Sequence, residues 1–341
     1  MKVRKTFLWL HRWTGVLAGL AILALAITGG ALVFEQAISR WLLPDLFPQE
    51  STPKEKRAPI TAALERLRVL HPESRVQGIR LPRDERDALV LFSGNRAVHF
   101  DPGTGELLGS RPRMGSWEQT MIKLHVKLLS GETGATIVVV ATGFTLGLAL
   151  SGLWLWWPWR ITWFSKGAAG RRFHFDLHSI AGLYSSLFLL VIGGSGLTLR
   201  YLHGEHPTAP PVSASQANGP RLSVDEAIRR AEAALPGARA AAVEMPPPNP
   251  RAAFRIQLSF PEDGSPAGRS VVFLDQFSGD VLAVHSSRVG SVLEKYQMAQ
   301  LSIHTGAVGG TFTRVIAFLT CVALVLQVVS GYLIWWKRPK A

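Results

Sequence analysis

Four histidines of this chain lie beside long apolar runs, and their metal-binding side chains are the strongest candidates for chemistry. His11 and His178 stand at the start of the first and third runs, and His125 and His304 come before the second and fourth, where we expect those spans to begin. Imidazole is the commonest metal ligand in proteins and also binds haem iron. Ionisable residues at membrane depth are costly and usually functional. We therefore predict two ligand pairs, His11 with His178 and His125 with His304, one near each membrane surface.

Two glycines indicate what such pairs would hold. Gly15 and Gly182 follow His11 and His178 by four residues, so each lies on the same helix face as its histidine. The missing side chain leaves room for a flat macrocycle, and helix bundles commonly bind haem through core histidines. His174 lies one turn before His178 and is the alternative ligand at that position.

Other metal and redox chemistry has less support. Cys321 is the single cysteine, which excludes an internal disulfide, a CxxCH haem site and a cysteine-held zinc or iron–sulfur centre. Glu35 and Glu132 are the only acids near the histidines, so zinc or iron held by protein ligands alone is disfavoured. No carboxylate lies inside an apolar run, which argues against a proton-driven transporter.

The histidines belong to a repeat that divides the chain into two halves. One offset aligns the first and third runs, and a second offset aligns the second and fourth. Internal repeats of this kind are typical of pseudo-symmetric membrane folds with sites at the repeat interface. The matched features are His11/His178, Gly15/Gly182 and Thr28-Gly29/Ser195-Gly196, then His125/His304, Gly131/Gly310, Ser151-Gly152/Ser330-Gly331 and Trp156-Trp157/Trp335-Trp336.

Four apolar runs must position these residues. Each has about 20 residues, enough for a helix to cross a hydrocarbon core of about 30 Å. The first run is too long for the apolar part of a typical signal peptide, so we expect it to stay in the protein. The four predicted spans are 13–34, 135–157, 177–199 and 314–336.

Charge gives these spans a direction. The net charge of +13 is concentrated in short basic clusters that flank the runs, which is the positive-inside pattern and not a nucleic-acid surface. It predicts a cytoplasmic N-terminus (1–12), loop (158–176) and tail (337–341). Both termini would then be cytoplasmic, in the inner membrane of a bacterium.

Two water-soluble segments, 48–118 and 203–298, then lie in the periplasm. Each begins with a helical pattern, continues with alternating strands and ends in a glycine turn, at 101–106 and 275–280. Ser223 with Glu226 predicts a capping box. A linker rich in Pro, Ser and Ala covers 204–220. His203 and His206 are interpreted as loop residues, with contact to a substrate as the alternative.

The predicted fold is a four-helix transmembrane bundle of two duplicated halves with two small α+β periplasmic domains. Across essentially its whole length the chain resembles the PepSY-associated transmembrane family, which includes iron-regulated membrane proteins and ferric-siderophore reductases. The two soluble segments resemble PepSY domains. The motifs that carry the resemblance are residues 11–15, 124–125, 151–158, 175–178, 304–306 and 330–338.

The resemblance implies two haem b groups, held by His11 with His178 and by His125 with His304. It implies an oxidoreductase that passes electrons through the inner membrane to a periplasmic ferric siderophore or another Fe(III) chelate. Some relatives carry a fused flavoprotein domain, and this chain does not, so a separate donor is expected, a cytoplasmic flavoprotein or a membrane quinol. The alternative is a membrane-tethered PepSY module that inhibits or regulates a periplasmic partner without redox activity.

Overall fold

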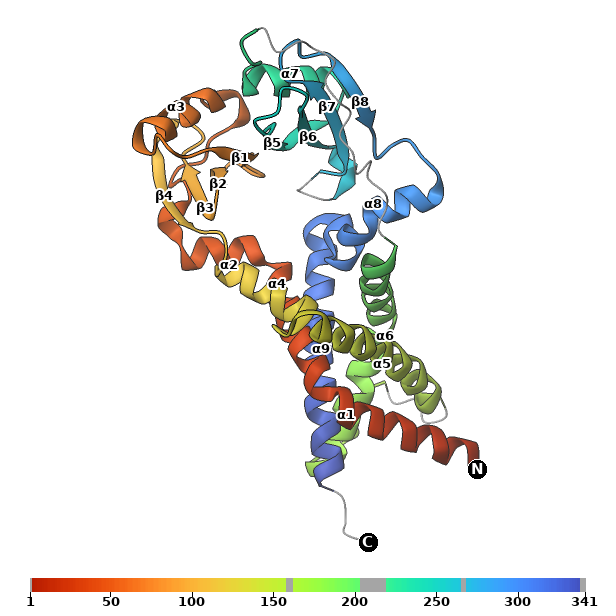
Figure 1. The fold of residues 1–341 in the computed structure, drawn as a ribbon. Coiled ribbons are helices and arrows are strands. Elements are labelled where there is room, and N and C mark those ends of the chain that lie inside the picture. Colours follow the sequence, from red (N-terminus) through yellow and green to blue (C-terminus); the bar gives the residue numbers. More distant parts are fainter. Residues whose placement is uncertain (1, 158–161, 203–218, 265–267, 338–341) are drawn as a thin grey trace. The chain divides into compact units, whose positions relative to one another are not determined.

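The computed structural model describes residues 2–157, 162–202, 219–264 and 268–337, drawn in Figure 1. His203, His206 and most of the expected linker lie outside these ranges. The chain divides into two compact units. The helical unit comprises Met1–Glu35, Trp117–His203 and Gln300–Ala341, and the sheet unit comprises Gln36–Ser116 and Gly204–Ala299.

Four long helices form the helical unit: α1 (Lys2–Val33), α5 (Gly131–Trp156), α6 (Gly170–Tyr201) and α9 (Gly310–Trp336). All four are long and apolar enough to span a membrane, the last with the short η4 (Ala307–Gly309) in front of it. Both α1 and α6 pack against α5 and against α9. The helices therefore form a bundle in which α1 and α6 are diagonal to each other, as are α5 and α9.

The first and third helices begin earlier than the predicted spans. The basic segment before each run is itself helical, because nothing in 2–12 or 171–176 breaks a helix. As a result His11 lies more than two turns inside α1, and His178 two turns inside α6. The backbone hydrogen bonds around both histidines are therefore already made within their helices.

The second and fourth spans are preceded by separate short helices, α4 (Trp117–Lys127) and α8 (Val292–His304). We expected His125 and His304 to begin the spans, whereas each lies at or near the end of its short helix. Left-handed backbone separates each short helix from its span, with Gly131 at φ 59° and Gly310 at φ 67°. Glycine tolerates this conformation without a steric penalty, which explains why both positions carry it.

The sheet unit corrects the expectation of two separate soluble domains. Its strands form one antiparallel eight-stranded sheet in the order β4-β3-β2-β1-β5-β6-β7-β8, and β1 pairs with β5 across the two segments. The strands are β1 (Val76–Arg80), β2 (Leu89–Ser93), β3 (Arg96–Phe100), β4 (Leu107–Pro112), β5 (Arg239–Glu244), β6 (Ala253–Ser259), β7 (Ser270–Asp275) and β8 (Val281–His285).

Helices α3 (Ile60–Leu70) and α7 (Val224–Ala234) join the two segments further, since both cover the same face of the sheet and share one core with it. The Asp225 carboxylate in α7 accepts hydrogen bonds from the amides of Ile60 and Thr61 in α3, at 2.8 and 3.0 Å. It thereby satisfies two of the free N–H groups at the start of that helix. The remaining short helices are α2 (Glu35–Leu42), η1 (Pro44–Leu46), η2 (Lys54–Lys56) and η3 (Pro261–Asp263).

Local signals in the sheet unit agree with the structure. The Ser223 hydroxyl accepts a hydrogen bond from the Glu226 amide at the start of α7, which is one half of the predicted capping box. The Glu226 carboxylate pairs with Arg229 and Arg230 instead of completing the box. In the turn between β3 and β4, the Asp101 carboxylate accepts bonds from the amides of Gly103 and Thr104. Asp275 does the same between β7 and β8. Short polar side chains that bond the backbone two or three residues onward stabilise such turns.

Candidate functional site

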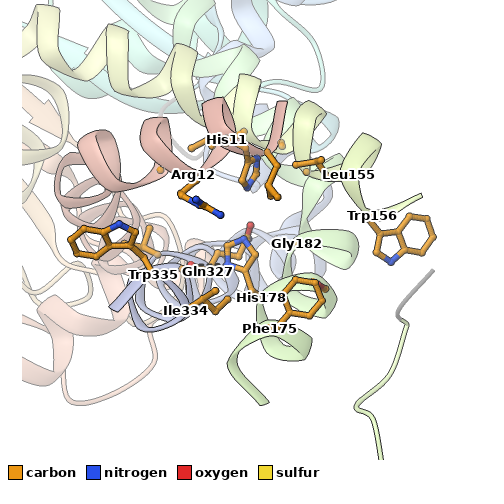
Figure 2. Close-up of a pocket in the computed structure, with 18 of the residues that line it drawn as sticks. His11, Arg12, Leu155, Trp156, Phe175, His178, Gly182, Gln327, Ile334 and Trp335 are labelled. Carbon is orange, nitrogen blue, oxygen red and sulfur yellow. Dashed lines mark hydrogen bonds between the residues drawn. The ribbon is translucent and has the colours of Figure 1, made fainter. Parts of the chain in front are cut away.

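The helical unit brings His11 of α1 and His178 of α6 face to face across the bundle. Their ring centres are 6.2 Å apart and the ring planes are nearly perpendicular, at 86°. Both rings line a cavity of about 470 Å³, and Figure 2 shows them on opposite sides of it. A cavity of this size lies within the range of small-molecule and cofactor sites.

Most of the cavity wall is apolar. Gly15 and Gly182, the glycines that the sequence marked, are both part of it, and their missing side chains leave the space beside the two imidazoles open. Aromatic rings and aliphatic side chains from α1, α5, α6 and α9 make up most of the remainder. Among them are Leu8, Val16, Leu148, Leu153, Leu155, Trp156, Phe175, Leu183, Leu189, Leu324, Val328, Tyr332, Ile334 and Trp335.

The second pair is formed by His125 of α4 and His304 of α8. Their ring centres are 6.0 Å apart with an angle of 53° between the planes. Burial lowers the pKa of both side chains, which lie outside the spanning helices, and the neighbouring His304 adds to the effect on His125, whose pKa falls to about 4. Both imidazoles are therefore neutral near pH 7, the form in which histidine binds metal.

Two of the four histidines donate to backbone carbonyls. The Nδ1 atom of His178 lies 3.0 Å from the carbonyl oxygen of Gln327, and that of His304 lies 2.9 Å from the carbonyl oxygen of Ile192. A carbonyl oxygen can only accept, so Nδ1 carries the hydrogen in both rings. The Nε2 atom of each neutral ring then has a free lone pair.

The other two histidines reach the same state through hydroxyl groups. Nδ1 of His11 lies 2.9 Å from Ser151 Oγ, and Nδ1 of His125 lies 3.0 Å from Thr28 Oγ1. Each hydroxyl already donates to a carbonyl in its own helix, Ser151 to Gly147 and Thr28 to Ala24. Both hydroxyls therefore accept from Nδ1–H, and Nε2 is again the open nitrogen.

A glycine lies against the Cε1 edge of every ring. A Cβ atom built on Gly196 would come 2.9 Å from His304 Cε1, and one on Gly29 would come 3.1 Å from His125 Cε1. The corresponding distances are 3.4 Å for Gly152 to His11 and 3.5 Å for Gly331 to His178. Glycine thus lets each imidazole approach the neighbouring helix closely enough for its Nδ1 hydrogen bond.

The Ser/Thr-Gly pairs were visible in the sequence as repeated features, but we assigned them no role there. Their recurrence in all four spans was the available signal. A repeated hydroxyl can bond another side chain, and the glycine next to it leaves room for that side chain to approach. Ser195 is the exception in the structure. Its hydroxyl donates to the Ile192 carbonyl of its own helix, and that same carbonyl accepts from His304.

His174 is not part of either pair. Its Nε2 lies 3.4 Å from Lys337 Nζ, and its ring packs against Phe173. The structure therefore places His178, and not His174, opposite His11. Which of the two binds a ligand stays a prediction.

The donor set would suit a metal that is already held by a cofactor. In the described ranges, no group of three or more His, Cys, Asp or Glu side chains is arranged to hold a metal ion, so each pair offers two nitrogens. Two imidazoles that shared one metal, each through a bond of about 2 Å and with a ring radius of about 1 Å, would have centres up to roughly 6 Å apart. The observed separations of 6.2 and 6.0 Å fit this arrangement, and the His11–His178 cavity supplies space between the rings.

A bundle of four membrane-spanning helices with paired histidines defines a multi-pass membrane protein. The model of the PepSY-associated TM region matches residues 8–338, which is almost the whole chain, and the protein belongs to this family. A comparison with curated proteins gave no match.

Proposed function

We propose that this protein carries electrons across the membrane through two haem b groups and delivers them to a ferric chelate. One group would be held by His11 and His178, and the other by His125 and His304. The observation that carries the proposal is that all four imidazoles donate from Nδ1 and keep Nε2 open, in two pairs whose ring centres are 6.2 and 6.0 Å apart. Haem supplies reversible one-electron chemistry at its iron.

The protein residues have three tasks in this proposal. The Nδ1 hydrogen bonds fix the tautomer and the orientation of each imidazole before it binds. The apolar side chains of the cavity exclude water, which favours the less charged state of a bound group and so influences its potential. The glycines beside the rings keep the imidazoles against the neighbouring helices, which limits their rotation.

The orientation of the protein in the membrane is part of the proposal. Basic clusters flank the ends of the spans at 2–12, 160–172 and 337–340, which favours the cytoplasmic side for these segments and for both termini. The sheet unit then lies in the periplasm of a bacterial inner-membrane protein built from two duplicated halves. The His11–His178 pair would be near the cytoplasm and the His125–His304 pair near the periplasm.

A ferric siderophore is the acceptor class that fits this path. Chelators with hard oxygen donors hold Fe(II) less tightly than Fe(III), so delivery of one electron releases the iron. The electron would come from a cytoplasmic flavoprotein or a membrane quinol. The competing proposal, a regulatory PepSY module, needs no open Nε2 atoms and no cavity beside His11 and His178.

An optical spectrum of the purified protein from haem-sufficient cells tests the proposal. We expect a b-type spectrum whose bands sharpen and shift on reduction, with about two haems per chain. Reoxidation by a ferric siderophore, followed by capture of Fe(II) with a ferrous-specific dye, would establish the acceptor. Folded but colourless protein would refute the haem proposal and favour the regulatory module.

Removing the hydroxyl partner of His11 should weaken the cofactor site more than the matched change at His178. In Ser151→Ala, His11 loses the one hydrogen-bond partner that its Nδ1 has in the described structure. In Ser330→Ala, His178 keeps the Gln327 carbonyl. We expect haem affinity at this pair to fall about 10- to 100-fold in Ser151→Ala and several-fold less in Ser330→Ala, measured by haem transfer to an excess of apomyoglobin. Equal losses would contradict the assigned roles of the two partners.

A further inference from the structure

The cavity between His11 and His178 is charged at one end. Three arginines belong to its wall: Arg4 and Arg12 of α1, and Arg171 in the first turn of α6. No acidic residue is among its lining residues in the described structure. The rest of the cavity reaches to Leu189 and Leu324, near the middles of their helices. The cavity is therefore apolar in its depth and cationic at the end where α6 begins.

Two of these arginines differ from others in the helical unit, because they face no carboxylate. Arg172 forms an ion pair of 2.8 Å with the buried Asp176, and Arg200 pairs with Glu132 at 3.0 Å. Within the described residues, Arg12 and Arg171 form no such ion pair. Figure 2 shows the Arg12 side chain extending into the space between His11 and His178. Arg12 is half-buried and Arg171 is exposed, so both guanidinium groups are accessible to an anion at this end of the cavity.

We propose that Arg12 and Arg171 bind the propionate carboxylates of the group held by His11 and His178. This inference rests on the proposed function and adds the orientation of the ligand, with its carboxylates at the arginine end and its apolar edge toward Leu189 and Leu324. The guanidinium fork matches a carboxylate with two parallel hydrogen bonds, and the apolar wall suits the macrocycle. Gly15 and Gly182 open the path between these two ends of the cavity.

A double-mutant cycle tests the contact. Full-length protein carrying His304→Ala, which leaves one intact pair, is depleted of haem and titrated with haem b or with its neutral dimethyl ester. We expect the ester to bind about 10- to 100-fold more weakly than haem b, because it cannot form the charge-assisted hydrogen bonds to the arginines. In the added double variant Arg12→Gln/Arg171→Gln, the two ligands should bind within about threefold of each other. Arg66→Gln, in the sheet unit, is the control and should preserve the full difference.

The outcomes separate this inference from the proposed function. If the starting protein binds haem b and its ester equally well, the carboxylate contact is refuted and the histidine pair stands. If it binds neither, both proposals fail. The same titrations are repeated with the protein in nanodiscs of increasing anionic-lipid content. If the affinities of both ligands change with the fraction of anionic lipid and do not depend on esterification, the arginines bind lipid headgroups and the inference is overturned.

Discussion

Replacing His304 by alanine is expected to remove one haem and leave the other, so that the haem content falls by about half. The reason is that His304 and His125 face each other on α8 and α4, while His11 and His178 come from different helices. His125→Ala should give the same result. Ferric-chelate reduction should fall to the background rate in both variants, because the proposed path would end before the acceptor.

Two controls separate loss of a ligand from misfolding. His174→Ala changes a histidine of the same helical unit that lies outside both pairs, and it should retain both haems. In His304→Gly, added imidazole can occupy the space of the missing side chain and should restore the spectrum of the second haem. If His304→Ala loses both haems while His174→Ala keeps them and imidazole restores nothing, the pairing of the histidines is wrong.

Replacing Gly182 by leucine is expected to abolish haem binding at the other pair without touching any ligand. Gly182 lines the cavity between His11 and His178, and a Cβ atom there would already contact the Gln327 side chain at 3.5 Å. A leucine side chain would therefore occupy part of this cavity. Leucine is also a better helix former than glycine, by up to about 1 kcal/mol, so α6 should remain folded.

Gly143→Leu is the matched control for this prediction. Gly143 lies on α5, is exposed on the bundle surface, and a Cβ atom there meets nothing within 4 Å. We expect Gly143→Leu to keep both haems and Gly182→Leu to keep one, with the reduced spectrum showing only the bands of the His125–His304 haem. Full haem content in Gly182→Leu would mean that the cavity is not the binding site.

The order of side chains along the sequence was enough to predict the spans and the pairing of the histidines. Long apolar runs predict membrane helices because hydrophobicity is a property of each residue and needs no partner. The repeat offsets matched His11 with His178 and His125 with His304, and the structure places each pair about 6 Å apart. Whether these pairs bind haem stays a prediction.

The join between the two soluble segments was not visible in the sequence. Strand β1 pairs with β5, in registers such as Ile79 opposite Val243, and these residues are more than 160 positions apart. An alternating pattern shows which side chains of a strand face a core, but it does not show which other strand that strand will pair with. The two segments therefore resembled two domains, while in the structure they share one sheet and one core.

The chain by itself determined the membrane class, the family motifs and the residues able to bind metal, since these follow from composition, spacing and side-chain chemistry. Only the tertiary structure decided which oxygen each Nδ1 meets, which glycine lies against each ring and where a cavity opens between His11 and His178. Those features depend on how far one helix is rotated against its neighbour. That rotation is set by the packing of all four helices together, and no local sequence pattern encodes it.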